Sequence, residues 1–155
     1  PASHSFMPTP LLLFASTRPE AIKLAPLVSA LEHLGSPPRT IVLGQQPEAA
    51  AAAFAEHGCH IDVLLPAVPH PLALRSLSAA LVDQALAVLA DQSSPGWAVV
   101  HGDTLGAHAA ATAARAQGWP IAHVEAGLRS HQLRAPFPEE WLRRDISRMA
   151  QRHYA

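Results

Sequence analysis

The sequence predicts an α/β domain in which a parallel β-sheet is covered by helices on both faces. Short apolar runs alternate with longer segments of helical spacing along the chain. Each run is too short for a helix and is apolar at successive positions, as in a strand buried on both faces. Five strands and five helices in strict alternation imply right-handed βαβ units and therefore a doubly wound parallel sheet.

The first strand is predicted at residues 11–15, and the first helix begins at Pro19 and ends before Gly35. Proline at the start of a helix and glycine just after its end are typical boundary signals. Further strands are predicted at 40–43, 61–65, 97–100 and 121–124, and further helices at 47–57, 72–89, 105–117 and 139–151. We expect the first strand to lie centrally, in a Rossmann-like strand order.

Length and composition narrow the class of protein. The chain has 155 residues, a length that fits one domain over residues 10–155. Its formal net charge is −1, so it lacks the excess of basic residues that nucleic-acid binding requires. Residues 1–9 are expected to be a flexible leader outside the fold, with Met7 as a candidate start. No apolar run is long enough to cross a bilayer, so no membrane association is expected. The lone Cys59 cannot form an internal disulfide, which favours a reducing compartment and a cytoplasmic location.

Polar and ionisable residues concentrate in the loops that follow four of the strands, at residues 16–20, 44–46, 101–104 and 125–138. In doubly wound sheets the ligand lies outside the carboxyl ends of the strands, where helix N-termini point. In the first loop, Arg18 is a candidate anion ligand beside a helix N-terminus. The alternative is that Thr17 caps the helix and Arg18 is solvated. Neither a dinucleotide fingerprint nor a Walker motif is present.

Three carboxylates are expected near one crevice. Asp103 and Glu125 each follow a strand directly, and Glu139 opens the last helix. Crowded carboxylates raise one another's pKa, which suits them to proton transfer. The alternatives are that Asp103 caps a helix and that Glu139 only complements the helix dipole and pairs with Arg143. His101 and His123 lie at strand ends, but zinc needs three or four converging ligands, so no metal is predicted.

Taken together, the four loops resemble the N-terminal half of the non-hydrolysing UDP-N-acetylglucosamine 2-epimerases. The matching segments are 16–23 (STRPEAIK), 101–104 (HGDT), 123–129 (HVEAGLR) and 136–144 (PFPEEWLRR). The resemblance implies a two-domain protein of the glycosyltransferase-B type, with a UDP-sugar bound between two Rossmann-like halves. It also implies that the C-terminal domain lies outside this chain, that no cofactor is needed, and that the family reaction interconverts UDP-GlcNAc and UDP-ManNAc through a glycal. A homodimer is left open.

The resemblance also assigns site residues. It implies that Asp103, Glu125 and Glu139 are catalytic and that the substrate is bound by Arg18, Lys23, His101, Thr104, His123 and Arg129. By itself the chain is expected to be inactive, because the remaining contacts of the family would come from the other half.

Four positions depart from the family motifs, namely Ser16, Gln46, Leu142 and Ser147. Serine in place of glycine at position 16 removes the freedom to adopt positive φ, which questions the geometry of the ligand site. Pro47 and Ala49 break the segment that binds a regulatory nucleotide sugar in the family. The alternatives are a related 2-epimerase acting on an acetamido uronic acid, half of a glycosyltransferase, or a non-catalytic module that binds sugar nucleotides.

Overall fold

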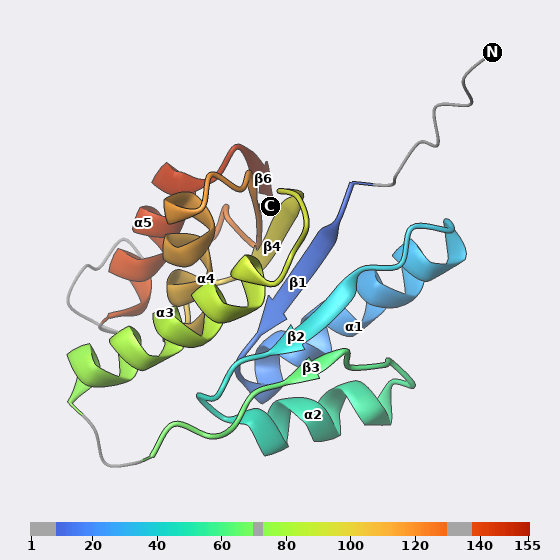
Figure 1. Ribbon diagram of the computed structural model, residues 1–155, viewed down its shortest axis with the longest axis horizontal. Coiled ribbons are helices and arrows are strands. Elements are labelled where there is room, and N and C mark those ends of the chain that lie inside the picture. Colours follow the sequence, from blue (N-terminus) through green and yellow to red (C-terminus); the bar gives the residue numbers. More distant parts are fainter. Residues whose placement is uncertain (1–8, 70–72, 130–137) are drawn as a thin grey trace.

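A computed structural model describes residues 9–69, 73–129 and 138–155. Within them, six parallel strands form one sheet in the order β3-β2-β1-β4-β5-β6 (Figure 1). The strands are β1 (Leu11–Ala15), β2 (Arg39–Val42), β3 (Val63–Leu64), β4 (Trp97–His101), β5 (Ile121–Val124) and β6 (Arg152–Tyr154). The doubly wound Rossmann-like class and the central position of the first strand are therefore confirmed.

Five helices cover the two faces of the described sheet: α1 (Arg18–His33), α2 (Pro47–Glu56), α3 (Leu74–Ala90), α4 (Leu105–Ala116) and α5 (Glu139–Met149). Because side chains alternate along a strand, Leu12 and Phe14 of β1 enter the core under α3, α4 and α5. Leu13 and Ala15 enter the second core, under α1 and α2. This double burial explains the continuous apolar run at 11–15.

Most predicted boundaries agree with the structure to within one or two residues. The Pro10 carbonyl accepts a hydrogen bond from the Trp97 amide at 2.8 Å, which extends the pairing of β1 with β4 by one residue. The predicted leader up to residue 8 and the predicted helix start at Leu72 lie outside the described residues.

The end of the chain differs from the prediction. The last helix ends at Met149 instead of Gln151, and residues 152–154 form β6 at the edge of the sheet, beside β5. All three residues of β6 are exposed, so no buried apolar pattern indicates this strand in the sequence. Backbone pairing creates it: the Gln151 amide donates to the Ile121 carbonyl at 2.9 Å, and the Ala126 amide donates to the Tyr154 carbonyl at 2.9 Å.

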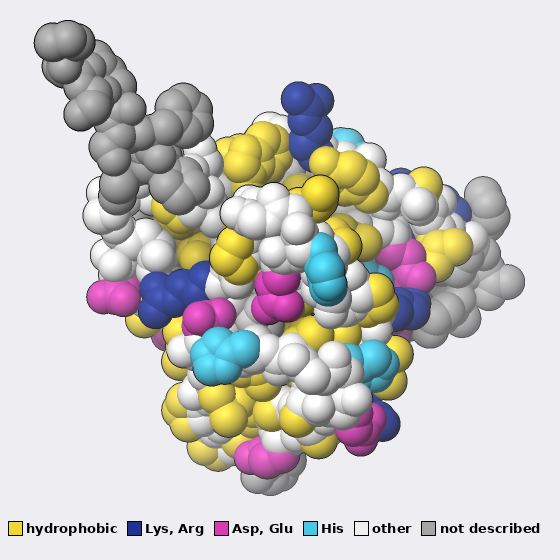
Figure 2. Space-filling view, turned by 90° about the vertical axis from the view of Figure 1, so that its right-hand side faces the viewer, with side chains coloured by type: hydrophobic (Ala, Val, Ile, Leu, Met, Phe, Trp, Pro, Cys, Tyr) yellow, Lys and Arg dark blue, Asp and Glu magenta, His cyan; other side chains and the backbone are white. Residues whose placement is uncertain are grey.

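Two surface properties bear on function. None of the described helices is long and apolar enough to cross a membrane. On the face shown in Figure 2, basic, acidic and histidine side chains are interspersed with apolar ones, and neither the basic nor the acidic side chains form a large charged patch there.

Candidate active site

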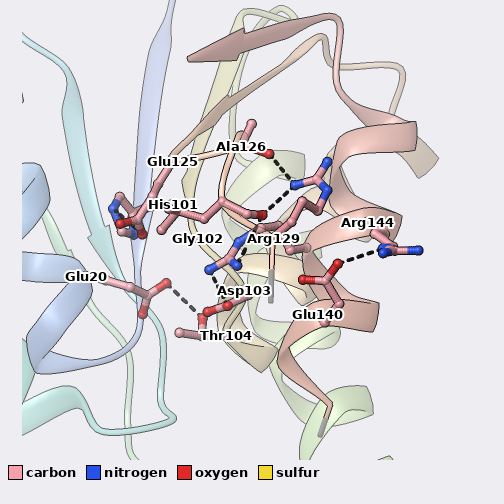
Figure 3. A network of polar contacts seen from close by, with 12 residues as sticks. Glu20, His101, Gly102, Asp103, Thr104, Glu125, Ala126, Arg129, Glu140 and Arg144 are labelled. Atoms are coloured by element: carbon pink, nitrogen blue, oxygen red, sulfur yellow. Dashed lines mark hydrogen bonds and ion pairs between the residues drawn. The ribbon is translucent and has the colours of Figure 1, made fainter. Parts of the chain in front are cut away.

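The candidate site lies where β4 and β5 end, beside the N-terminus of α5 (Figure 3). Two residues at these strand ends have left-handed backbone conformations. Gly102, after β4, has φ of 67°, and Glu125, after β5, has φ of 59°. A non-glycine residue rarely adopts such a conformation, and such strain clusters at functional sites. The sharp turns place Asp103 and Glu125 at the same edge of the sheet.

Asp103 lies at the centre of the charged cluster. Its carboxylate forms an ion pair with the Arg143 guanidinium of α5, and only 22% of the Asp103 side chain is exposed. Burial raises the pKa of Asp103, Arg143 opposes the rise, and the charges of Glu139 and Glu125 add to it. The net effect is a raised pKa, because this carboxyl is partly desolvated and faces two further acids.

Glu125 has a different environment from Asp103. One carboxylate oxygen accepts a hydrogen bond from Lys23 Nζ at 2.6 Å, and the other lies 3.4 Å from His101 Nε2. Burial acts to raise the pKa of Glu125, but the hydrogen bond and the charge of Lys23, together with the charge of Arg143, oppose it, and the net effect is a lowered pKa. Glu125 is therefore ionised at neutral pH.

His101 is held neutral beside Glu125. Burial lowers its pKa to about 4, and the charge of Glu125 only partly compensates. At pH 7 the imidazole therefore adds no positive charge to the site, and Lys23 supplies the cation next to Glu125.

Glu139 and Asp103 both line a crevice of about 400 Å³ between the loops after β1, β2 and β4 and the start of α5. Glu139 Oε2 is buried and has no hydrogen-bond partner in the described part of the chain. A buried acceptor without a donor costs free energy, so this oxygen is available to a donor from a ligand. Glu125 does not line this crevice and lies beside His101, after β5.

The structure gives Arg18 and Arg129 local partners. The Arg18 guanidinium donates to both carboxylate oxygens of Glu56, at 3.2 and 2.9 Å, and 45% of its side chain is exposed. Arg129 donates to the carbonyls of Ala126 and Leu128, at 2.7 and 2.6 Å. To bind a diphosphate, Arg18 would have to exchange Glu56 for the ligand.

His123 is fully buried on β5. Its ring lies between two partners, with Nε2 2.7 Å from the Gly102 carbonyl and Nδ1 3.1 Å from the Ser147 hydroxyl. Burial lowers the pKa of His123, against the effect of the Gly102 carbonyl, so the ring is neutral. All the contacts of this ring are with the protein itself.

Sequence reasoning missed Glu20, which is 2% exposed in the first turn of α1. Its carboxylate accepts hydrogen bonds from the Ser16 amide and hydroxyl, at 2.9 and 2.8 Å, and from the Thr17 hydroxyl, at 2.9 Å. A fourth hydrogen bond comes from the Thr104 hydroxyl, at 2.8 Å. The spacing Thr17-x-x-Glu20 is the capping-box signal, which would have directed attention to this residue.

The structure also decides three of the alternatives. The N-cap of α4 is Thr104, whose hydroxyl accepts from the Ala107 amide, and not Asp103. Arg143 pairs with Asp103, whereas the pair four residues apart on α5 is Glu140 with Arg144. The φ of Ser16 is not positive, so serine needs no glycine-like conformation there.

Fold and site together define a Rossmann-like domain with an acid–base cluster at the carboxyl edge of its sheet. The chain belongs to the UDP-N-acetylglucosamine 2-epimerase family, whose family model matches residues 31–155. It is 34% identical over 146 residues to the UDP-N-acetylglucosamine 2-epimerase of Neisseria meningitidis and 35% identical over 148 residues to that of Salmonella typhimurium. Each alignment covers 94% of this chain but only 39% of the relative.

Solved structures agree with this assignment. The N. meningitidis UDP-GlcNAc 2-epimerase bound to UDP-GlcNAc superimposes with a TM-score of 0.86 at 32% identity, over 94% of this chain and 39% of that one. Staphylococcus aureus MnaA, solved with UDP, has a TM-score of 0.84 at 32% identity, over 95% of this chain and 39% of that one. The chain thus spans about two-fifths of the proteins it matches.

Proposed function

We propose that this chain is the N-terminal, Rossmann-like part of a glycosyltransferase-B-type UDP-GlcNAc 2-epimerase, and that its carboxyl edge exchanges the proton at C2 of the sugar. The observation that supports this most is the raised pKa of Asp103 beside Glu125 and Glu139. Groups whose pKa values are shifted by burial and neighbouring charges cluster at functional sites. A relative of the same fold has been solved with UDP-GlcNAc bound.

The chemistry requires anionic groups around the sugar. Departure of UDP breaks the C1–O bond, the electron pair leaves with the diphosphate, and C1 acquires oxocarbenium character. This acidifies the C2 proton, whose removal by a carboxylate forms the C1–C2 double bond of a glycal. Protonation of C2 from the other face and return of UDP to C1 complete the inversion, so the reaction is redox-neutral. Carboxylates stabilise the cationic transition state electrostatically.

The structure supports different roles for two of the acids. Asp103 has the raised pKa and is the candidate for proton transfer, since a catalytic pKa closer to the operating pH favours exchange. Glu125, ionised and hydrogen-bonded to Lys23, is the candidate for stabilising positive charge at C1. Glu139, whose Oε2 has no partner among the described residues, is the candidate for accepting a hydrogen bond from a hydroxyl or amide group of the sugar.

The proposal includes the state of the isolated chain. By itself it should be inactive and should bind UDP-GlcNAc weakly, because the crevice is open to water on the side where a second domain would close. The partners in this proposal are a UDP-sugar and that second domain. A cytoplasmic location is supported by the single, buried Cys59, which has no thiol to pair with.

The test is incubation of the protein at its natural length with UDP-GlcNAc in deuterium oxide, followed by proton NMR. We expect deuterium at C2 of the sugar and the appearance of UDP-ManNAc. A folded, soluble protein that leaves the sugar unlabelled would overturn the proposal. Labelling of only the corresponding UDP-linked acetamido uronic acid would retain the reaction but change the substrate.

A further inference from the structure

The turn that carries Asp103 is held through both of its neighbours. Gly102 precedes Asp103 and Thr104 follows it, and each forms a hydrogen bond with a buried side chain from another part of the fold. β4 lies between β1 and β5 in the sheet. Glu20, on the helix after β1, therefore reaches the turn from one side, and His123, on β5, reaches it from the other.

Glu20 determines the orientation of the Thr104 hydroxyl. That hydroxyl has a single hydrogen, which it donates to Glu20 Oε1 at 2.8 Å, while it accepts from the Ala107 amide at 3.0 Å. Three other donors, from Ser16 and Thr17, hold the second carboxylate oxygen of Glu20. The carboxylate therefore ties the loop after β1 to the loop after β4 through four hydrogen bonds.

His123 determines the position of the Gly102 carbonyl. A carbonyl only accepts, so His123 Nε2, 2.7 Å away, must carry the hydrogen. The neutral ring then has a bare Nδ1, and the Ser147 hydroxyl, 3.1 Å away, must donate to it. The Gly102 amide is also held, since it donates to the Val124 carbonyl at 3.0 Å.

We propose that Glu20 and His123 are positioning residues that together fix the turn bearing Asp103. Neither touches the sugar; each acts through a neighbour of Asp103 in the chain. This inference rests on the proposed function, because a catalytic value for the turn requires that Asp103 transfers the C2 proton. Displacement of a catalytic group by about 1 Å costs about 10²-fold in rate, so a rigid turn has a direct catalytic value.

Kinetics on the protein at its natural length provide the first test. Glu20→Gln should lower kcat by about 10²-fold with little change in KM, because substrate contacts remain while the turn moves. Glu32→Gln is the matched control, an exposed carboxylate of the same helix. In the double variant Glu20→Gln/Thr104→Val the losses should not add, since Glu20 acts through Thr104. Fully additive losses would overturn the link between them.

Variants of Ser147 test the bond between His123 and Gly102, the residue before Asp103. They remain informative if Glu20→Gln does not fold. Ser147→Ala removes the hydroxyl that holds the His123 tautomer and should lower kcat by about 10-fold. Ser147→Thr keeps the hydroxyl and should restore the rate. Equal rates for alanine and threonine would contradict the role of this hydrogen bond.

NMR on the 155-residue chain separates this inference from the proposed function. We expect ¹⁵N spectra of the His123 ring to show the hydrogen on Nε2, and amide exchange at residues 102–104 to accelerate at least about tenfold in Glu20→Gln and Ser147→Ala. A hydrogen on Nδ1, or unchanged exchange in both variants, would overturn the inference even if the enzyme epimerises. Accelerated exchange in a protein without epimerase activity would support the positioning and refute only the proposed reaction.

Discussion

Replacement of Arg143 by glutamine should raise the pKa of Asp103 further. Glutamine preserves hydrogen-bonding capacity but removes the positive charge that now opposes burial and the charges of Glu125 and Glu139. An opposite charge at contact distance lowers a carboxyl pKa by about 1–3 units, so its loss should raise the pKa of Asp103 by about that amount. At about 1.4 kcal/mol per unit, ionised Asp103 would be destabilised by about 1.4–4 kcal/mol.

The sign of the pH dependence follows from linkage. A carboxyl whose pKa is higher in the folded chain than in the unfolded chain binds more protons when folded, so stability falls as pH rises between the two values. The unfolded value for aspartate is near 3.8. Wild-type Asp103 already has a raised pKa, so both proteins lose stability alike just above the unfolded value. The stability lost in Arg143→Gln relative to wild type should therefore grow from the wild-type pKa of Asp103 upward and level off above the higher pKa of the variant.

Two measurements check this prediction. Carbon-13 NMR of the aspartate side chains, with the Asp103 signal assigned from Asp103→Asn, follows the pKa directly, and urea unfolding from pH 3 to 8 follows the free energy. Arg148→Gln is the matched control, an exposed arginine on the same helix. An unchanged or lower pKa of Asp103 in Arg143→Gln, or the same rise in Arg148→Gln, would refute the reasoning.

Three further predictions concern the site and its support. In the protein at its natural length, Asp103→Asn, Glu125→Gln and Glu139→Gln should each lower turnover by about 10²–10⁴-fold with the circular dichroism unchanged; near-normal turnover in all three would contradict the assignment. Calorimetric titration of the 155-residue chain with UDP-GlcNAc should show binding weaker than micromolar, and micromolar affinity would show that the chain is sufficient alone. Gly106→Ala places a Cβ 2.1 Å from the Ser16 hydroxyl oxygen and should destabilise the chain by about 1–3 kcal/mol in urea unfolding. The destabilisation should shrink in a Ser16→Gly background, and an equal loss there would show that the clash is not its cause.

The edge of the sheet at which Asp103 and Glu125 lie could be predicted because parallel strands all end at the same edge. Asp103 and Glu125 follow β4 and β5, and that order in the chain is enough to place them together. Their partners could not be predicted in the same way. The spacing on the last helix offers a pair of Arg143 with Glu139 as one alternative, and the structure pairs Arg143 with Asp103 instead.

Local sequence patterns also do not reveal hydrogen bonds between residues of different loops or strands. Glu20 has the spacing of a capping-box residue, but it accepts from the Ser16 amide and hydroxyl and from the Thr17 hydroxyl instead of from the Thr17 amide. Its bond to Thr104 spans 84 positions in the sequence. The motif around His123 does not indicate the enclosure of its ring by Gly102 and Ser147, which is visible only when β4, β5 and α5 are packed together.

The sequence by itself determined the class of fold, the succession of βα units and the edge at which the acids gather. Those properties depend on hydrophobic periodicity and on the direction of parallel strands, both of which are local or follow from chain order. Only the tertiary structure decided that residues 152–154 form a sixth strand, that Arg18 pairs with Glu56, and which partners shift the pKa values of the acids. These properties depend on backbone pairing at an exposed edge and on charges that are distant in sequence but close in space, and neither leaves a periodic signal along the chain.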